Sequence, residues 1–70
     1  MQINEFKAEV ARNGMTMEEL AGATGITRTT LWRRLSKPNE FELIEIKSIA
    51  KVLHLSKSKI LDIFFADKVS

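Results

Sequence analysis

Four positively charged side chains that could bind an anion fall in a segment of this 70-residue chain that has no carboxylate. Arg28, Arg33, Arg34 and Lys37 lie between residues 20 and 39, and the acidic residues cluster on both sides of that segment. Cations gathered on one face attract phosphate, and an arginine can donate two hydrogen bonds to a guanine edge. The pattern indicates nucleic-acid binding. A solvated basic helix face is the alternative.

The sequence offers little for catalysis or for binding a metal. It has no cysteine, no glycine-rich phosphate loop and no nucleophile beside a base, and His54 is its only histidine. We expect His54 to lie near a helix C-terminus, where the helix dipole favours a cation. We therefore expect a protein that is not an enzyme and that uses no metal, cofactor or small-molecule substrate.

Length and composition predict one small domain with a packed core. Hydrophobic residues make up 44% of the 70 residues, and the net charge of +2 is too small to identify a partner. No apolar run approaches the ~18 residues of a membrane span, and no signal peptide is recognisable. We expect a cytoplasmic protein without membrane association.

The elements that must position the cations are helices. Thr16, Thr27 and Ser56 are good N-cap residues, Glu42 is a weaker one, and Gly25 suits a helix end. No strand pattern competes, so the fold class is expected to be all-α and compact. Together with apolar periodicity, these signals predict five helices at about residues 3–13, 17–24, 28–36, 43–54 and 57–65.

Residues 16–36 are typical of a helix, a short turn and a second helix. Gly25 suits a turn that needs a positive φ, and Ile26 is expected to plug that turn into the core. In the second helix, Leu31 and Leu35 lie one turn apart and should face inward. At ~100° per residue, Arg33 then points outward. Its expected neighbours on this exposed face are Thr27, Arg28, Thr29 and Ser36.

This stretch resembles the helix-turn-helix of the lambda-repressor and Cro-type regulators, the XRE group. The matching residues are Thr16, Glu19, Leu20, Ala21, Gly25, Ile26, Thr27, Thr30, Leu31 and Arg33. The resemblance covers about residues 6–65. It implies a five-helix lambda-repressor-like domain from a phage or prophage. It also implies a sequence-specific repressor of the Cro type that inserts its third helix into the major groove of a double-stranded DNA operator.

The resemblance also assigns contacts to individual residues. Base contacts would fall on Thr27, Arg28, Thr29, Trp32 and Arg33, although Trp32 is also suited to partial packing. Phosphate contacts would fall on Thr16, Met17, Thr30, Arg34, Ser36 and Lys37. Met17 stands where many relatives carry a glutamine, so this chain departs from the family pattern there.

The last helix carries more apolar residues than one buried stripe needs. Leu61, Phe64 and Phe65 are therefore expected to form a homodimer contact, or a heteromeric contact with another regulator. Related proteins bind as symmetric dimers with half-sites ~34 Å apart. Two other functions are consistent with this surface, namely an antirepressor that binds a partner repressor and an antitoxin-like autoregulator.

Overall fold

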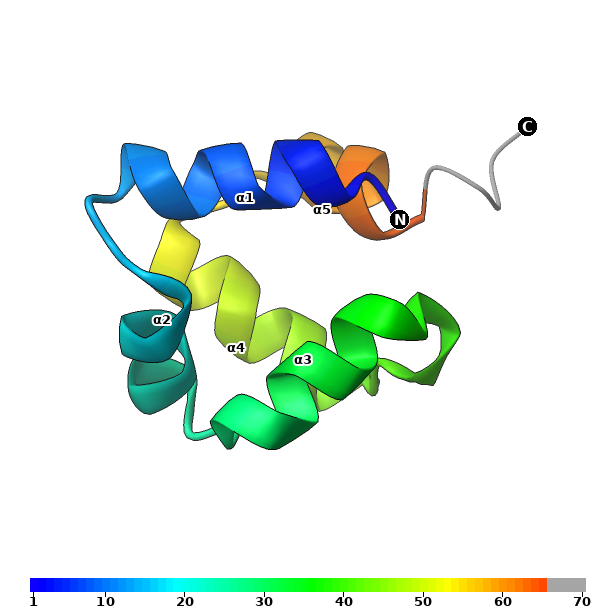
Figure 1. Cartoon of the computed structure of the whole chain (residues 1–70). Helices are drawn as coiled ribbons and strands as arrows, with labels where there is room; N and C mark the ends of the chain where they lie inside the picture. The colour runs from blue at the N-terminus through cyan, green and yellow to red at the C-terminus, as the bar shows by residue number, and fades with distance from the viewer. Residues whose placement is uncertain (66–70) are drawn as a thin grey trace.

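Five α-helices and one short 3-10 helix form the computed structural model, which describes residues 1–65 (Figure 1). Residues 1–65 contain no strand, so the all-α prediction is confirmed, and the five expected helices are present. Three of them end one residue earlier than expected. The elements are α1 (Ile3–Arg12), α2 (Met17–Thr24), α3 (Arg28–Ser36), η1 (Pro38–Glu40), α4 (Leu43–Leu53) and α5 (Lys57–Phe64).

The helix starts follow from local side-chain hydrogen bonds. The Thr16 hydroxyl accepts from the Glu19 N–H at 3.1 Å, and the Glu19 carboxylate accepts from the Thr16 N–H at 2.9 Å. The Thr27 hydroxyl likewise accepts from the third N–H of α3, and the Ser56 hydroxyl accepts from that of α5. These bonds satisfy donors that a helix start leaves free, so the three predicted caps are confirmed.

Two helix ends adopt left-handed backbone. Gly25 ends α2 with a φ of 75°, as the turn was expected to require. His54 ends α4 with a φ of 55°, a conformation that a residue with a Cβ rarely adopts. The Leu55 N–H then donates to the Ala50 carbonyl at 2.9 Å and closes the helix. The expected placement of His54 at a helix C-terminus is thus confirmed, but its left-handed backbone was not expected.

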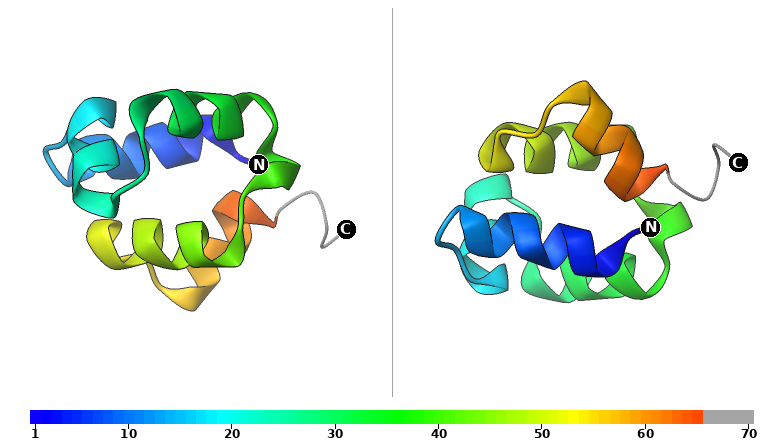
Figure 2. Two further views of the ribbon diagram at one scale, coloured as in Figure 1. Left: turned by 90° about the horizontal axis from the view of Figure 1, so that it is seen from below. Right: turned by 90° about the horizontal axis from the view of Figure 1, so that it is seen from above.

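The core lies where all five helices meet. In Figure 1, α1 and α5 lie on one side of the molecule and α2 and α3 on the other, and α4 packs against both α2 and α5. Figure 2 shows the same arrangement from below and from above. The largest fully buried side chains are Phe6, Leu20, Leu31, Ile49, Leu53 and Ile63.

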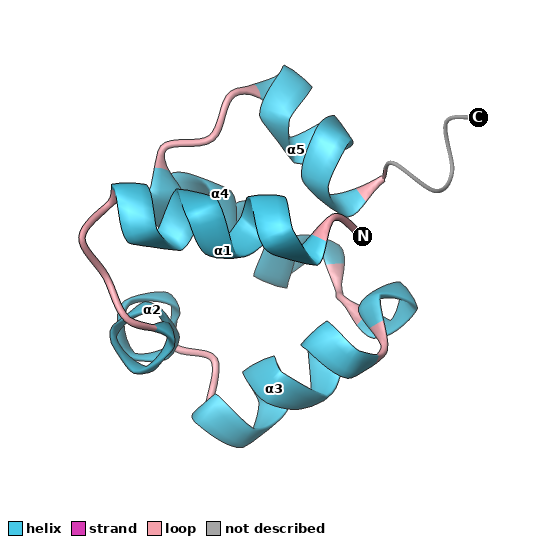
Figure 3. Ribbon diagram, turned by 45° about the horizontal axis from the view of Figure 1, so that its top comes forward, coloured by secondary structure: helices cyan, strands magenta, loops and turns pink. Residues whose placement is uncertain are grey.

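Helices α1 and α5 lie side by side (Figure 3). The Phe64 ring packs edge-on against Phe6, with 6.1 Å between ring centroids, and against Phe41 at 5.5 Å. Because Phe64 is only 8% exposed, it belongs to the core, and the structure does not support its expected place in a partner interface. Leu61 on the same helix is 52% exposed, and Phe65 is partly buried against the core.

Candidate nucleic-acid interface

The turn between α2 and α3 is fixed by its own hydrogen bonds. The Thr24 hydroxyl donates to the Leu20 carbonyl at 2.9 Å and accepts from the Ile26 N–H at 3.4 Å. Ile26 is buried at 9% exposure, so it anchors the turn in the core as predicted. Sequence reasoning did not identify Thr24. Its hydroxyl ties the last turn of α2 to the turn that leads into α3.

Helix α3 has one buried face and one polar face. Leu31 and Leu35 are 1% and 5% exposed, which confirms that they face inward. The side chains expected on the outer face are all exposed: Thr27, Arg28, Thr29, Arg33 and Ser36. The first turn of α3 contains no acidic residue. The structure therefore presents a basic, hydroxyl-rich helix face to solvent.

The two arginines on this face have guanidinium groups that can reach a ligand. Among residues 1–65, Arg33 forms no ion pair. Arg28 lies 4.0 Å from the Glu18 carboxylate, and both side chains are mostly exposed. Such an exposed pair contributes only ~0–1 kcal/mol, so a ligand phosphate or base can replace it.

The hydroxyl groups of Thr27 and Thr30 form a short relay at the start of α3. The Thr27 hydroxyl donates to the Thr30 hydroxyl at 2.8 Å while it accepts from the Thr30 N–H at 3.2 Å. Because the Thr30 oxygen accepts within this relay, its own hydrogen is left to donate outward. This geometry suits an external acceptor such as a phosphate oxygen.

Arg34 points away from the exposed face and towards α4. Its Nε donates to Glu45 Oε1 at 3.0 Å and its Nη2 to Glu45 Oε2 at 3.4 Å, and both side chains are largely buried. The phosphate contact expected of Arg34 would require this pair to break. A single sequence gives no signal for a pair eleven residues apart on two helices.

The Arg34–Glu45 pair shifts the pKa of both groups. Burial raises the pKa of the Glu45 carboxyl, but hydrogen bonds from Arg34 and from the Glu42 N–H lower it by more, so the pKa lies below its usual range. The hydrogen bond to Glu45 raises the pKa of Arg34 despite the opposing effect of burial. Both groups are therefore charged at neutral pH.

The remaining residues expected to contact DNA differ in which of their atoms are accessible to a ligand. Trp32 is 43% exposed, and Lys37 is exposed at the end of α3. The Ser36 hydroxyl donates to the Trp32 carbonyl at 3.4 Å. Met17 packs its side chain against the core, so only its backbone at the start of α2 remains for a phosphate. The Thr16 hydroxyl serves the capping bond described above.

A shallow groove of about 400 Å³ lies beside α3, on the side where α4 begins. Thr27 and Thr30 line one wall, and Glu42, Ile44 and Glu45 line the other. Ile44 is 69% exposed, and sequence reasoning did not single it out. The exposed Glu42 carboxylate makes this wall less favourable for phosphate than the outer face of α3.

Within residues 1–65, no three histidine, cysteine or acidic side chains lie close enough to hold a metal ion. No helix in this part of the chain is long and apolar enough to cross a membrane.

Comparison with known proteins gives a family for this arrangement. The helix-turn-helix family matches residues 6–60. The chain is also 38% identical over 57 residues to the SPbeta prophage-derived uncharacterized HTH-type transcriptional regulator YopO of Bacillus subtilis (strain 168), and the match covers 81% of each chain. No solved structure gives a match. The chain therefore belongs to the XRE-type helix-turn-helix family of DNA-binding regulators, the group that its sequence resembles.

Proposed function

We propose that this protein is a sequence-specific transcriptional repressor of the Cro type, which inserts α3 into the major groove of a double-stranded operator. The observation that carries the proposal is the outer face of α3, where Arg33 is exposed and forms no ion pair among residues 1–65. The major groove is ~12 Å wide and admits an α-helix. The prophage relative named above is itself a transcriptional regulator by name.

The proposed contacts divide into base reading and phosphate binding. Arg33 and Arg28 can donate pairs of hydrogen bonds to guanine O6 and N7, and Thr29 can contact a base edge or a thymine methyl. Thr27 and Trp32 flank them. Phosphate contacts fall on the Thr30 hydroxyl and on Lys37, with Ser36, Thr16 and the Met17 backbone at the periphery.

A symmetric dimer would place two copies of α3 on successive half-sites ~34 Å apart. The exposed Leu61 and the partly buried Phe65 on α5 supply an apolar surface for that contact. The same surface would serve a partner repressor if the chain acted as an antirepressor.

The test begins with selection of bound sequences from a random DNA pool, followed by affinity measurements over a salt series. We expect affinity to fall with salt at a slope of ~−0.9 per phosphate contacted. Arg33→Ala should cost ~1–3 kcal/mol and relax the preference at one base pair. Lys7→Ala is the matched control, because Lys7 is an exposed cation on α1, on the opposite side of the molecule from α3. No preference for any sequence would reject the repressor function and favour the antirepressor.

A further inference from the structure

Arg34 and Glu45 connect α3 to α4 through two hydrogen bonds, which Nε and Nη2 of the arginine donate to the two carboxylate oxygens. The distances are 3.0 Å from Nε to Oε1 and 3.4 Å from Nη2 to Oε2. The two side chains are 14% and 13% exposed, so both charges are largely withdrawn from solvent. A paired guanidinium and carboxylate in this geometry have a defined mutual orientation.

The same carboxylate also holds the start of α4. Glu45 Oε1 accepts from the Glu42 N–H at 2.8 Å as well as from Arg34. One oxygen therefore joins the side chain of a residue on α3 to the first backbone donor at the start of α4. A displacement of α3 relative to α4 would break the bonds from Arg34, whereas the bond from the Glu42 N–H lies within the start of α4 and keeps the Glu45 carboxylate in place.

This connection adds to what the core does in setting the rotation of α3 about its own axis. Leu31 and Leu35 project within ~40° of each other and hold one side of the helix in the core, and the bonds from Arg34 hold a second side. At ~100° per residue, Arg34 projects ~60° to one side of Leu31 and Arg33 projects on the outer face. Rotation of α3 would move Arg33 sideways across the floor of the DNA major groove.

We propose that Arg34 and Glu45 are positioning residues, which set the rotation of α3 so that Arg33 and Thr29 meet the base edges. This inference rests on the proposed function. Neither side chain touches DNA. A phosphate contact by Arg34 would instead leave the Glu45 carboxylate largely buried without its partner, which is unfavourable.

Two substitutions that each remove one negative charge separate positioning from electrostatics. Glu40→Gln removes a carboxylate on η1 that is exposed and acts on Arg34 only through its charge. Loss of a carboxylate near DNA should leave affinity unchanged or strengthen it. Glu45→Gln also removes a carboxylate, but it replaces one of the two oxygens that Arg34 binds with an amide NH2 group, which cannot accept a hydrogen bond. We expect it to weaken binding to the selected site by about tenfold, or about 1.4 kcal/mol.

Arg34→Lys separates positioning from phosphate binding. Lysine keeps the charge and binds phosphate well, but it lacks the planar fork that engages both carboxylate oxygens. We expect Arg34→Lys to weaken specific binding as Glu45→Gln does. We expect both variants to keep wild-type affinity for random duplex DNA, and both to keep the wild-type salt slope.

The outcomes decide between the roles. Equal affinities of Glu45→Gln and Glu40→Gln for the selected site would overturn the proposal. Wild-type affinity of Arg34→Lys for that site would also overturn it, as would a parallel loss of specific and random binding in either variant. Thermal melting followed by circular dichroism selects a temperature at which each variant is folded, and Arg34→Lys alone decides the matter if Glu45→Gln does not fold. A wild-type protein without any sequence preference would reject the proposed function itself.

Discussion

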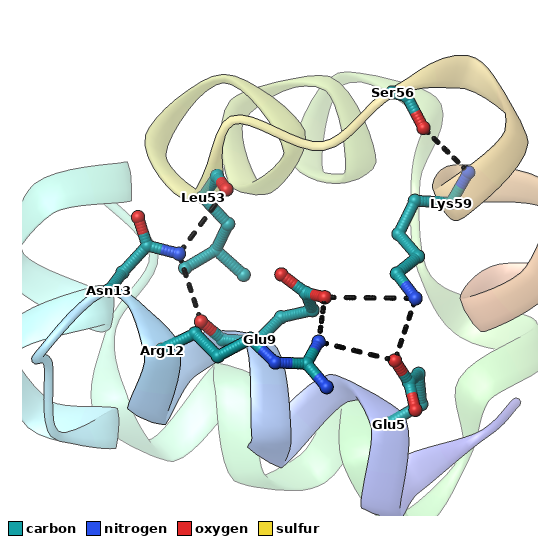
Figure 4. A network of polar contacts seen from close by, with 7 residues as sticks. All are labelled: Glu5, Glu9, Arg12, Asn13, Leu53, Ser56 and Lys59. Atoms are coloured by element: carbon teal, nitrogen blue, oxygen red, sulfur yellow. Dashed lines mark hydrogen bonds and ion pairs between the residues drawn. The ribbon is translucent and has the colours of Figure 1, made fainter.

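The Lys59 ammonium on α5 lies 2.8 Å from Glu5 Oε1 and 3.8 Å from Glu9 Oε1, both on α1 (Figure 4). Glu9 is 9% exposed, and its carboxylate also pairs with Arg12. The buried carboxylate of α1 is thus paired with one cation from its own helix and with one from α5. The pairing links the first and last helices through charge as well as through the core.

Lys59→Met should lower the free energy of unfolding, because it removes the hydrogen bond to Glu5 and leaves the buried Glu9 carboxylate with one cation fewer. Urea denaturation measures the difference. Lys57→Met is the matched control, since Lys57 is exposed on the same helix and forms no ion pair among residues 1–65. Equal effects of the two substitutions would contradict a stabilising role for the network.

The ion pairs should make stability fall in acid. The hydrogen bond from Lys59, with its charge, holds the pKa of Glu5 below its usual range, and the pKa of Glu45 is also lowered on balance. A carboxyl group whose pKa is lower in the folded state stabilises the protein above its unfolded pKa of about 4.3. That contribution is lost as the pH falls through the folded pKa values. Urea midpoints measured between about pH 3 and about pH 7 should show the decline, and Glu5→Gln should make it shallower.

The hydrogen bond between Lys59 and Glu5 raises the pKa of Lys59 above its ordinary value. Its contribution is therefore complete below about pH 10.4, the unfolded pKa, and is lost as the pH rises through the folded pKa. Stability measured in alkaline solution should decline less in Lys59→Met than in the wild type. A parallel decline in both proteins would argue against this assignment.

Gly22 and Gly25 should respond to alanine in opposite directions. Gly22 lies within α2, and a Cβ there would meet no atom within 4 Å, so Gly22→Ala should stabilise the protein by up to ~1 kcal/mol. Gly25 has a φ of 75°, so Gly25→Ala should destabilise it by ~1–2 kcal/mol. Thermal melting of the two variants checks both signs. A loss of stability in Gly22→Ala would show that this glycine has a role beyond helix propensity.

Leu61→Asp should abolish self-association if α5 forms the dimer contact. Leu61 is 52% exposed, so the substitution should leave the fold intact. Sedimentation equilibrium of the wild type and the variant measures the change. Ser58→Asp, which adds the same charge at an exposed position of α5, is the control. A monomeric wild type on and off DNA would remove the dimer from the proposal.

The sequence predicts the helices well because the signals for them are local. Thr16, Thr27 and Ser56 each accept the bond that a cap residue should accept, and Gly25 adopts the positive φ that the turn needs. The outward face of α3 follows from Leu31 and Leu35 once the helix is known. These inferences use only neighbours within about one or two turns.

The features that sequence reasoning missed depend on packing between helices. Helical periodicity shows that Phe64 is apolar but does not show whether it faces the core or a partner, and contact with Phe6 decides the matter. The partnership of Arg34 and Glu45 likewise depends on the angle between α3 and α4. Periodicity within one helix carries no information about that angle.

The Phe64–Phe6 contact and the bond from the Gln2 N–H to the Ile63 carbonyl also have a consequence for folding order. Contacts between residues far apart in the sequence require a long loop to close, which costs conformational entropy. Such contacts form late in folding and slow it relative to local contacts. Helices α2, α3 and α4 lie between these contacts along the chain, so their local bonds can form before this closure, whereas the packing of Phe6 against Phe64 needs α5. During synthesis, α3, the helix that we propose reads DNA, would therefore be made before α5 completes the packing around α1.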